Sequence, residues 1–195
     1  MSGRVIFLLE EPSMKTFLLE FLPRLIPGWQ HERDFLLLAH EGKSDLEASI
    51  ARKLKAWREP QVRFVIVRDN DNADCLALKR RLLALASGSG REVLVRLVCQ
   101  ELEAWYLADT QTLSKVYPDC AAAIRRLGKR FPNPDACPKP SASLKQAIAC
   151  FQKTDAARRM GKALPVQTAR SASLQAFVTG LERLVGKDTA SQRGV

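Results

Sequence analysis

The N-terminal part of the chain alternates short apolar runs with longer amphipathic stretches. Apolar runs cover residues 5–9, 35–40, 63–68 and 93–99, and the last run, VLVRLVC, carries one arginine. Runs of this length predict strands covered on both faces of a sheet. Helical patterns cover residues 13–25, 44–57 and 73–86. Because strand and helix alternate, residues 1–110 predict a three-layer, Rossmann-like α/β domain with a mainly parallel four-stranded sheet.

Two of these helices carry apparent start signals. Ser13 follows Pro12 and is expected to cap the first helix. Ser44 stands three residues before Glu47, which is the spacing of a capping box.

The strand pattern stops after Glu101. Helical patterns follow at 101–117, 121–127, 144–151, 156–160 and 174–185, and a proline-rich loop is expected over 131–143. Residues 111–188 therefore predict a helical extension packed on the α/β core. Residues 189–195 are expected to form a frayed tail.

The charge is concentrated in this extension. The chain has a formal net charge of +10, whereas residues 1–110 contain equal numbers of basic and acidic side chains, so the whole excess lies in residues 111–195. A basic region joined to a neutral one favours a polyanionic partner, and nucleic acid is favoured over an anionic membrane. The expected contacts are the basic residues Arg125, Arg126, Lys129, Arg130, Arg158 and Arg159.

Composition excludes several classes of protein. No apolar run approaches the roughly 20 residues that span a bilayer, and the apolar stretch near the N-terminus is too short for a secretory signal, so we expect a cytoplasmic protein. The five cysteines never form a CxxC pair, and the chain has only two histidines. A disulfide scaffold and a zinc site are therefore not expected.

Acidic side chains follow each predicted strand. The strands are followed by Glu10 and Glu11, by Glu41, by Asp69, Asp71 and Asp74, and by Glu101 and Glu103. Ligands of open parallel sheets bind beyond the carboxyl ends of the strands, where these acids would converge. Clustered carboxylates repel one another, and a hard cation such as Mg²⁺ relieves that repulsion. For any single acid, a loop or helix-cap role is the simpler interpretation.

Asp69 and Asp71 are two residues apart. If the extended chain continues through both, they face the same side and could serve one metal site. Trp105 and Tyr106 belong to a helical stripe, which predicts a core position more strongly than a base-stacking platform.

Three segments of the chain resemble a Toprim domain, the topoisomerase–primase fold. They are VIFLLEEPSMKTFL, FVIVRDND and ELEAWYLAD. The chain is most similar to a bacterial Toprim-like family, domain of unknown function 4276, whose members are often encoded beside AAA-type ATPases. The resemblance extends to FQKTDAARRMGKAL and RSASLQAFVTGL near the C-terminus.

The resemblance implies a role for each acid. Glu10 takes the position of the Toprim glutamate, Asp69 and Asp71 take the DxD positions, and Glu103 matches the acid of an E-x-W segment. Glu10, Asp69 and Asp71 would be catalytic, and all four acids would hold Mg²⁺ or Mn²⁺. Lys43 or Lys153 would offset the charge of a phosphate. The pattern departs from Toprim at Glu11, where glycine is usual, and at Met14, where an acid is common.

Three functions follow as hypotheses. The first is a Mg²⁺-dependent nuclease or phosphoryl-transfer enzyme acting on nucleic acid without sequence specificity, as the effector of an ATPase-linked defence system. The second is a non-catalytic binding or regulatory partner of an AAA-type ATPase. The third is a phospho-acceptor switch at Asp69. The sequence leaves the oligomeric state open, with a homodimer as one candidate.

Overall fold

The computed structural model describes residues 3–167 and 170–191, with the side chains of 187–191 excepted. Its centre is a sheet of four parallel strands in the order β2-β1-β3-β4. The strands are β1 (Val5–Leu9), β2 (Phe35–Ala39), β3 (Arg63–Asp69) and β4 (Val93–Val98). Every paired strand runs parallel, with Val5 opposite both Phe35 and Arg63. The predicted α/β fold is confirmed.

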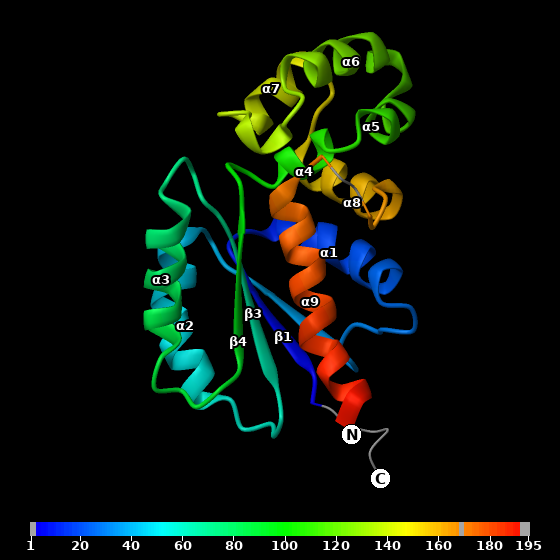
Figure 1. The fold of residues 1–195 in the computed structure, drawn as a ribbon. Coiled ribbons are helices and arrows are strands. Elements are labelled where there is room, and N and C mark those ends of the chain that lie inside the picture. The colour runs from blue at the N-terminus through cyan, green and yellow to red at the C-terminus, as the bar shows by residue number, and fades with distance from the viewer. Residues whose placement is uncertain (1–2, 168–169, 192–195) are drawn as a thin grey trace.

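Two hydrophobic clusters lie on opposite faces of the sheet. Ile6 and Leu8 of β1 pack with α2 (Lys43–Ala56) and α3 (Cys75–Ala86), whereas Phe7 and Leu9 pack with α1 (Pro12–Leu25) and the C-terminal helices. The alternation of side chains along a strand explains this division. Figure 1 shows the result, with α2 and α3 on one face and α1 and α9 (Ala172–Ser191) on the other.

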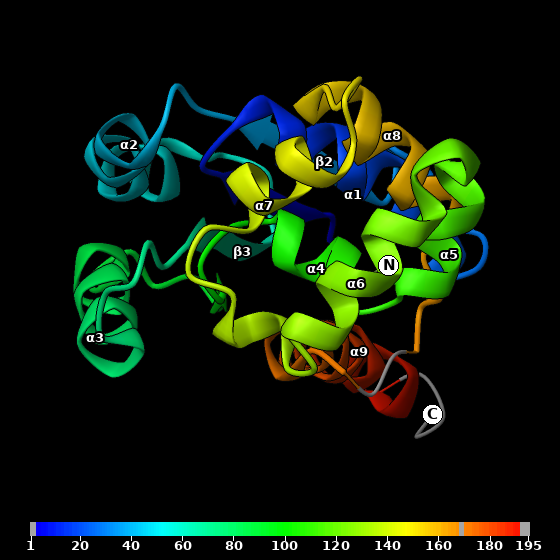
Figure 2. The same ribbon diagram turned by 90° about the horizontal axis from the view of Figure 1, so that it is seen from above.

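The remaining helices gather beyond the carboxyl ends of the strands. They are α4 (Glu103–Leu107), α5 (Thr110–Val116), α6 (Ala121–Arg130), α7 (Pro140–Ala147) and α8 (Lys153–Ala163). In Figure 1, α4, α5, α6 and α7 lie above the sheet and α8 lies next to α1. Figure 2, seen from above, shows α5 and α8 on the side of α1 and α9, away from α2 and α3. Two short 3-10 turns, Pro118–Cys120 and Pro134–Ala136, connect them. The C-terminal helices therefore cover the edge at which the acids were expected.

The C-terminal helices share the core of the sheet. Gly161 of α8 lies against α1, where an added Cβ atom would stand 2.6 Å from the carbonyl oxygen of Phe17. Trp105 and Tyr106 are fully buried in the same cluster, which confirms their predicted core positions. The Trp105 indole N–H donates a hydrogen bond of 2.9 Å to the Ser173 hydroxyl and so ties α4 to α9.

Both predicted caps were wrong. Helix α1 begins at Pro12 with Glu11 at its N-cap, and the Ser13 hydroxyl donates a short hydrogen bond to the Glu11 carboxylate. Helix α2 begins at Lys43 with Gly42 at its N-cap, where φ is 108° and a side-chain cap is absent. A glycine adopts this backbone conformation readily, so the N-cap lies two residues earlier than the serine motif predicts.

Two C-terminal boundaries also differ from expectation. Helix α7 begins at Pro140, inside the predicted loop, because proline is well tolerated in the first turn of a helix. Helix α9 continues to Ser191, so residues 189–191 are helical, and residues 192–195 of the predicted tail lie outside the described residues. Within the part of the chain that the structure describes, no helix is long and apolar enough to cross a membrane.

Candidate carboxylate site

Two acids from adjacent strand ends meet directly. The carboxylate of Glu10, which follows β1, accepts a hydrogen bond of 3.0 Å from the backbone N–H of Asp69, the last residue of β3. Parallel pairing of the two strands places their carboxyl ends at one edge, which accounts for the meeting. The expected proximity of Glu10 and Asp69 is therefore present.

Asp71 does not share a face with Asp69. The chain leaves the extended conformation after β3, because Asp71 has φ of 48° and Asn72 has φ of 63°. Asp69 is buried at 5% exposure, whereas the Asp71 side chain is 41% exposed and pairs with the Lys43 ammonium at 3.3 Å. The assumption of a continuous strand was wrong. Asp71 and Lys43 form an outer ion pair beside the buried acids.

A third strand end contributes Glu103. This residue begins α4, shortly after β4, and is 1% exposed. Lys153, the first residue of α8, places its ammonium 3.8 Å from the Glu103 carboxylate and 3.4 Å from that of Glu11. We call Glu10, Glu11, Asp69 and Glu103 the carboxylate cluster, with Lys153 as its cation.

Burial and mutual repulsion favour the protonated acids. Burial, followed by the charges of Glu10, Glu11 and Glu103, raises the pKa of Asp69 well above its usual range. Burial raises the pKa of Glu103 to about 7, although Lys153 opposes the shift. Burial and the charge of Asp71 raise the pKa of Glu10.

The surrounding acids favour the charged form of Lys153. Burial disfavours its charge, but Glu103 and Glu11 outweigh burial and raise the pKa of Lys153. One ammonium therefore faces several acids, and the cluster carries more negative than positive charge when every group is ionised.

The donor atoms suit a hard divalent cation. Among the described residues, Asp69 Oδ1 and both carboxylate oxygens of Glu103 are buried without a hydrogen-bond partner. Such atoms are costly to bury, and carboxylate oxygens are the ligands that Mg²⁺ prefers. Within residues 3–167 and 170–191, however, no three His, Cys, Asp or Glu side chains are already arranged to hold a metal ion. The chemistry of the donors fits a cation, and binding would require the carboxylates to draw closer.

Sequence reasoning missed an arginine behind the cluster. Arg68 lies in β3 with its side chain 7% exposed, and its Nε atom is 3.7 Å from the Glu10 carboxylate. Its guanidinium also donates a short hydrogen bond to Glu47 of α2, which in turn pairs with Arg81 of α3. An arginine inside an apolar strand needs a buried partner, and this was the available signal.

Two further groups at the site had no role assigned from the sequence. Glu11 was expected at this edge and departs from the Toprim pattern, and its carboxylate lies 3.4 Å from the Lys153 ammonium. The Tyr106 hydroxyl is fully buried, lacks a hydrogen-bond partner among the described residues, and has a pKa raised by burial and by Glu103 and Glu11.

Apart from Lys43 and Lys153, none of the predicted basic residues forms an ion pair with Asp71 or with the carboxylate cluster among the described residues. Arg125, Arg126, Lys129 and Arg130 are exposed on α6, and Arg158 is exposed on α8. Arg159 pairs with Asp155 at 2.8 Å and lies over the Tyr117 ring. Asp74, another acid after β3, caps α3 by accepting a hydrogen bond from the Ala77 N–H.

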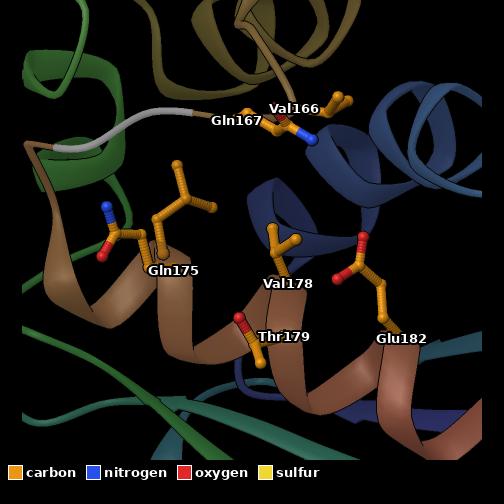
Figure 3. Close-up of a pocket in the computed structure, with 7 residues that line it drawn as sticks. Val166, Gln167, Gln175, Val178, Thr179 and Glu182 are labelled. Atoms are coloured by element: carbon orange, nitrogen blue, oxygen red, sulfur yellow. The ribbon is translucent and has the colours of Figure 1, made fainter.

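A cavity of about 450 Å³ lies elsewhere, between residues 166–167 and α9. Figure 3 shows Val166 and Gln167 on one side and Gln175, Val178, Thr179 and Glu182 of α9 on the other. The described lining contains none of the acids of the carboxylate cluster. This cavity is therefore separate from the candidate site.

Comparisons with known proteins agree with the fold. The C-terminal region of the OLD protein of Xanthomonas campestris pv. campestris superposes with a TM-score of 0.50 at 12% identity, covering 96% of this chain and 98% of that chain. At this identity the likeness concerns the fold alone. No curated protein matches the chain. The sequence matches the family described as "Domain of unknown function (DUF4276)" over residues 9–182, and the chain belongs to that family.

Proposed function

We propose that this protein is a metal-dependent phosphoryl-transfer enzyme that hydrolyses phosphodiester bonds in nucleic acid. The observation that carries the proposal is the carboxylate cluster. Three strand ends deliver Glu10, Asp69 and Glu103 to one edge of the sheet, and buried oxygens of Asp69 and Glu103 lack hydrogen bonds among the described residues. Burial and, after it, repulsion between the acids raise their pKa values, and a divalent cation would offset both effects.

The cation would be held by Asp69 and Glu103, with Glu10 or Glu11 as a further ligand. When bound, it would neutralise phosphate charge and assist an in-line displacement. Lys153 would then be released from Glu11 and Glu103 to face a phosphate oxygen, and Lys43 could act in the same way from the outer ion pair with Asp71. Resemblance to Toprim domains supports this assignment of roles.

A non-catalytic module is the second candidate, and one observation favours it. The described acids are not preassembled into a metal site, and Lys153 already compensates part of their charge. The protein would then serve as a binding partner, with an AAA-type ATPase as the partner that the resemblance predicts. Asp69 is 5% exposed, so access for a small phosphodonor is poor and the phospho-acceptor hypothesis gains no support.

A cleavage assay separates the first two candidates. End-labelled single- and double-stranded DNA and RNA are incubated with the protein and Mg²⁺, Mn²⁺ or EDTA. The enzyme hypothesis expects metal-dependent cleavage by the wild type and by Glu41→Gln, which alters an exposed acid at the same edge. It expects loss of cleavage in Asp69→Asn and Glu10→Gln. Binding without cleavage under every metal condition would favour the non-catalytic module.

A further inference from the structure

A groove lies between α6 and α7, two helices that stand over the carboxyl edge of the sheet. Its volume is about 260 Å³, and its polar lining is formed by Arg126 and Arg130 of α6 with Ser143 and Gln146 of α7. The two arginines are four residues apart, so they lie on the same face of the helix. Leu127 and Ala147 supply apolar lining between them. Figure 2 shows α6 and α7 together over the carboxyl edge of the sheet.

The positive charges of this groove are not neutralised by ion pairs among the described residues. Within the described part of the chain, neither Arg126 nor Arg130 has a carboxylate within 4.0 Å. Arg130 lies over the Phe131 ring at 5.1 Å, which leaves its N–H donors available to another acceptor. By contrast, Arg159 and Lys162 of α8 pair with Asp155 and Glu20.

The side chains that line the groove are suited to bind a phosphate group. Arginine presents a planar fork of N–H donors that matches phosphate oxygens, and the serine hydroxyl and glutamine amide add further donors. The residues that line the described groove include no acid to repel an anion and no aromatic ring on which a base could stack. Contacts with phosphates position a nucleic acid without reading its sequence.

The groove is tied to the candidate site through α7. The Ser141 N–H in the first turn of α7 donates a hydrogen bond of 2.7 Å to Glu101, which follows β4. The Asn72 side chain, next to Asp71, donates a hydrogen bond of 3.4 Å to the carbonyl oxygen of Pro138, just before α7. Two loops at the carboxyl edge of the sheet therefore hold the wall of the groove.

We propose that the α6–α7 groove is a phosphodiester subsite that binds the backbone of a nucleic acid strand beside the carboxylate cluster. The nature of the ligand rests on the proposed function. The subsite itself binds without metal and without cleavage, because its donors are the side chains of Arg126, Arg130, Ser143 and Gln146.

Two matched double variants test the proposal. Arg126→Ala/Arg130→Ala removes the two groove arginines. Arg125→Ala/Lys129→Ala removes two positive charges from the same helix that were also expected contacts from the sequence but lie outside the groove lining, so the proposal assigns them a minor role. Binding of a labelled single strand, as DNA and as RNA, is measured by fluorescence anisotropy in EDTA. We expect the groove pair to weaken binding at least about tenfold and the control pair less than about threefold. The slope of log affinity against log salt should fall by about 1.4 for the groove pair.

A milder variant protects the test from a folding artefact. Arg126→Lys/Arg130→Lys keeps both charges but removes the guanidinium forks, and it should give an intermediate loss of affinity. Circular dichroism confirms that each variant is folded.

Several results would overturn the proposal. These are absence of binding by the wild type, equal losses in the two alanine pairs, or a loss that is larger on vesicles of phosphatidylserine and phosphatidylcholine than on nucleic acid. Binding in EDTA is independent of cleavage. If Asp69→Asn and the wild type bind equally and neither cleaves, the proposed function fails while the subsite stands.

Discussion

The backbone N–H of Asp69 donates a 3.0 Å hydrogen bond to the carboxylate of Glu10, across 59 positions of sequence. The bond joins the end of β3 to the end of β1 and holds two acids close together. It also stabilises the charged form of Glu10, although burial and Asp71 prevail and raise the pKa of Glu10. The fold thus maintains carboxylates at one edge despite their repulsion, which is the arrangement that a cation would stabilise.

The stability of the protein should depend on pH through Glu103. Its pKa is raised from 4.5 to about 7, so between these values the folded protein retains a proton that the unfolded chain releases. The contribution of this group to stability therefore falls as pH rises from about 4.5 to 7. Glu103→Gln should increase the free energy of unfolding at pH 8 by about 1–3 kcal/mol and leave it nearly unchanged below pH 4.5.

Urea denaturation at pH 4 and pH 8, without divalent metal, measures this difference. Glu41→Gln is the control for loss of one acid, because Glu41 is exposed. A Glu103→Gln variant that is less stable than the wild type at pH 8 would show that the buried carboxylate is a stabilising partner of Lys153 instead.

Replacing Lys153 should separate metal binding from catalysis. Lys153→Gln removes the ammonium that lies 3.4 Å from Glu11 and 3.8 Å from Glu103. The cluster then gains net negative charge, so Mn²⁺ should bind at least as tightly as in the wild type. Cleavage should slow by about tenfold or more, because the phosphate loses a positive charge. Lys79→Gln, at an exposed lysine on α3, should change neither quantity. Weaker Mn²⁺ binding in Lys153→Gln would refute the expected competition between the ammonium and the metal.

Glu47 pairs with the buried Arg68 and the exposed Arg81, and these two contacts should contribute very differently to the free energy of unfolding. Glu47→Gln leaves the Arg68 side chain, which is 7% exposed, without its main carboxylate partner. We expect a loss of about 3 kcal/mol in the free energy of unfolding. Arg81→Ala removes a side chain that is 65% exposed and should cost about 0–1 kcal/mol. Chemical denaturation of both variants checks the contrast, and equal losses would contradict it.

The contact between α1 and α8 depends on a glycine. A Cβ atom at Gly161 would lie 2.6 Å from the carbonyl oxygen of Phe17, which is backbone and cannot swing away. Gly161→Ala should therefore destabilise the protein by about 1–3 kcal/mol. At Gly186 of α9 an added Cβ meets nothing within 4 Å, so Gly186→Ala should be neutral or stabilising. Thermal melting of both variants measures this difference. A Gly161→Ala variant that melts no lower than the wild type would show that α1 and α8 can move apart to admit the Cβ atom.

The sheet and its layers could be predicted from the sequence. The four strands appear in the sequence as apolar runs, which is the pattern of strands buried on both faces of a sheet. Their alternation with helical patterns indicates the fold class. The acids at the strand ends followed from the same pattern, since parallel strands share a carboxyl edge. The meeting of Glu10 and Asp69 needed no further information.

The remaining parts of the site depend on geometry that local patterns do not encode. Asp71 does not join Asp69 among the buried acids because two successive residues adopt positive φ, which aspartate and asparagine tolerate but do not require. Its charge still acts on Glu10 and raises the pKa of that residue. Lys153 reaches Glu11 across 142 positions, and only the packing of α8 on α1 brings them together. Gly42, with a φ of 108°, takes the N-cap position of α2 that the capping-box motif assigned to Ser44.

The central claim is that acids from separate strand ends share one cation, and a Mn²⁺ titration followed by electron paramagnetic resonance tests it most directly. The signal of free Mn²⁺ should fall as wild-type protein is added. Asp69→Asn and Glu103→Gln should each weaken binding by at least about tenfold, while Glu41→Gln should bind as the wild type does. A wild type that leaves the free Mn²⁺ signal unchanged, or an Asp69→Asn variant that binds equally well, would contradict the account.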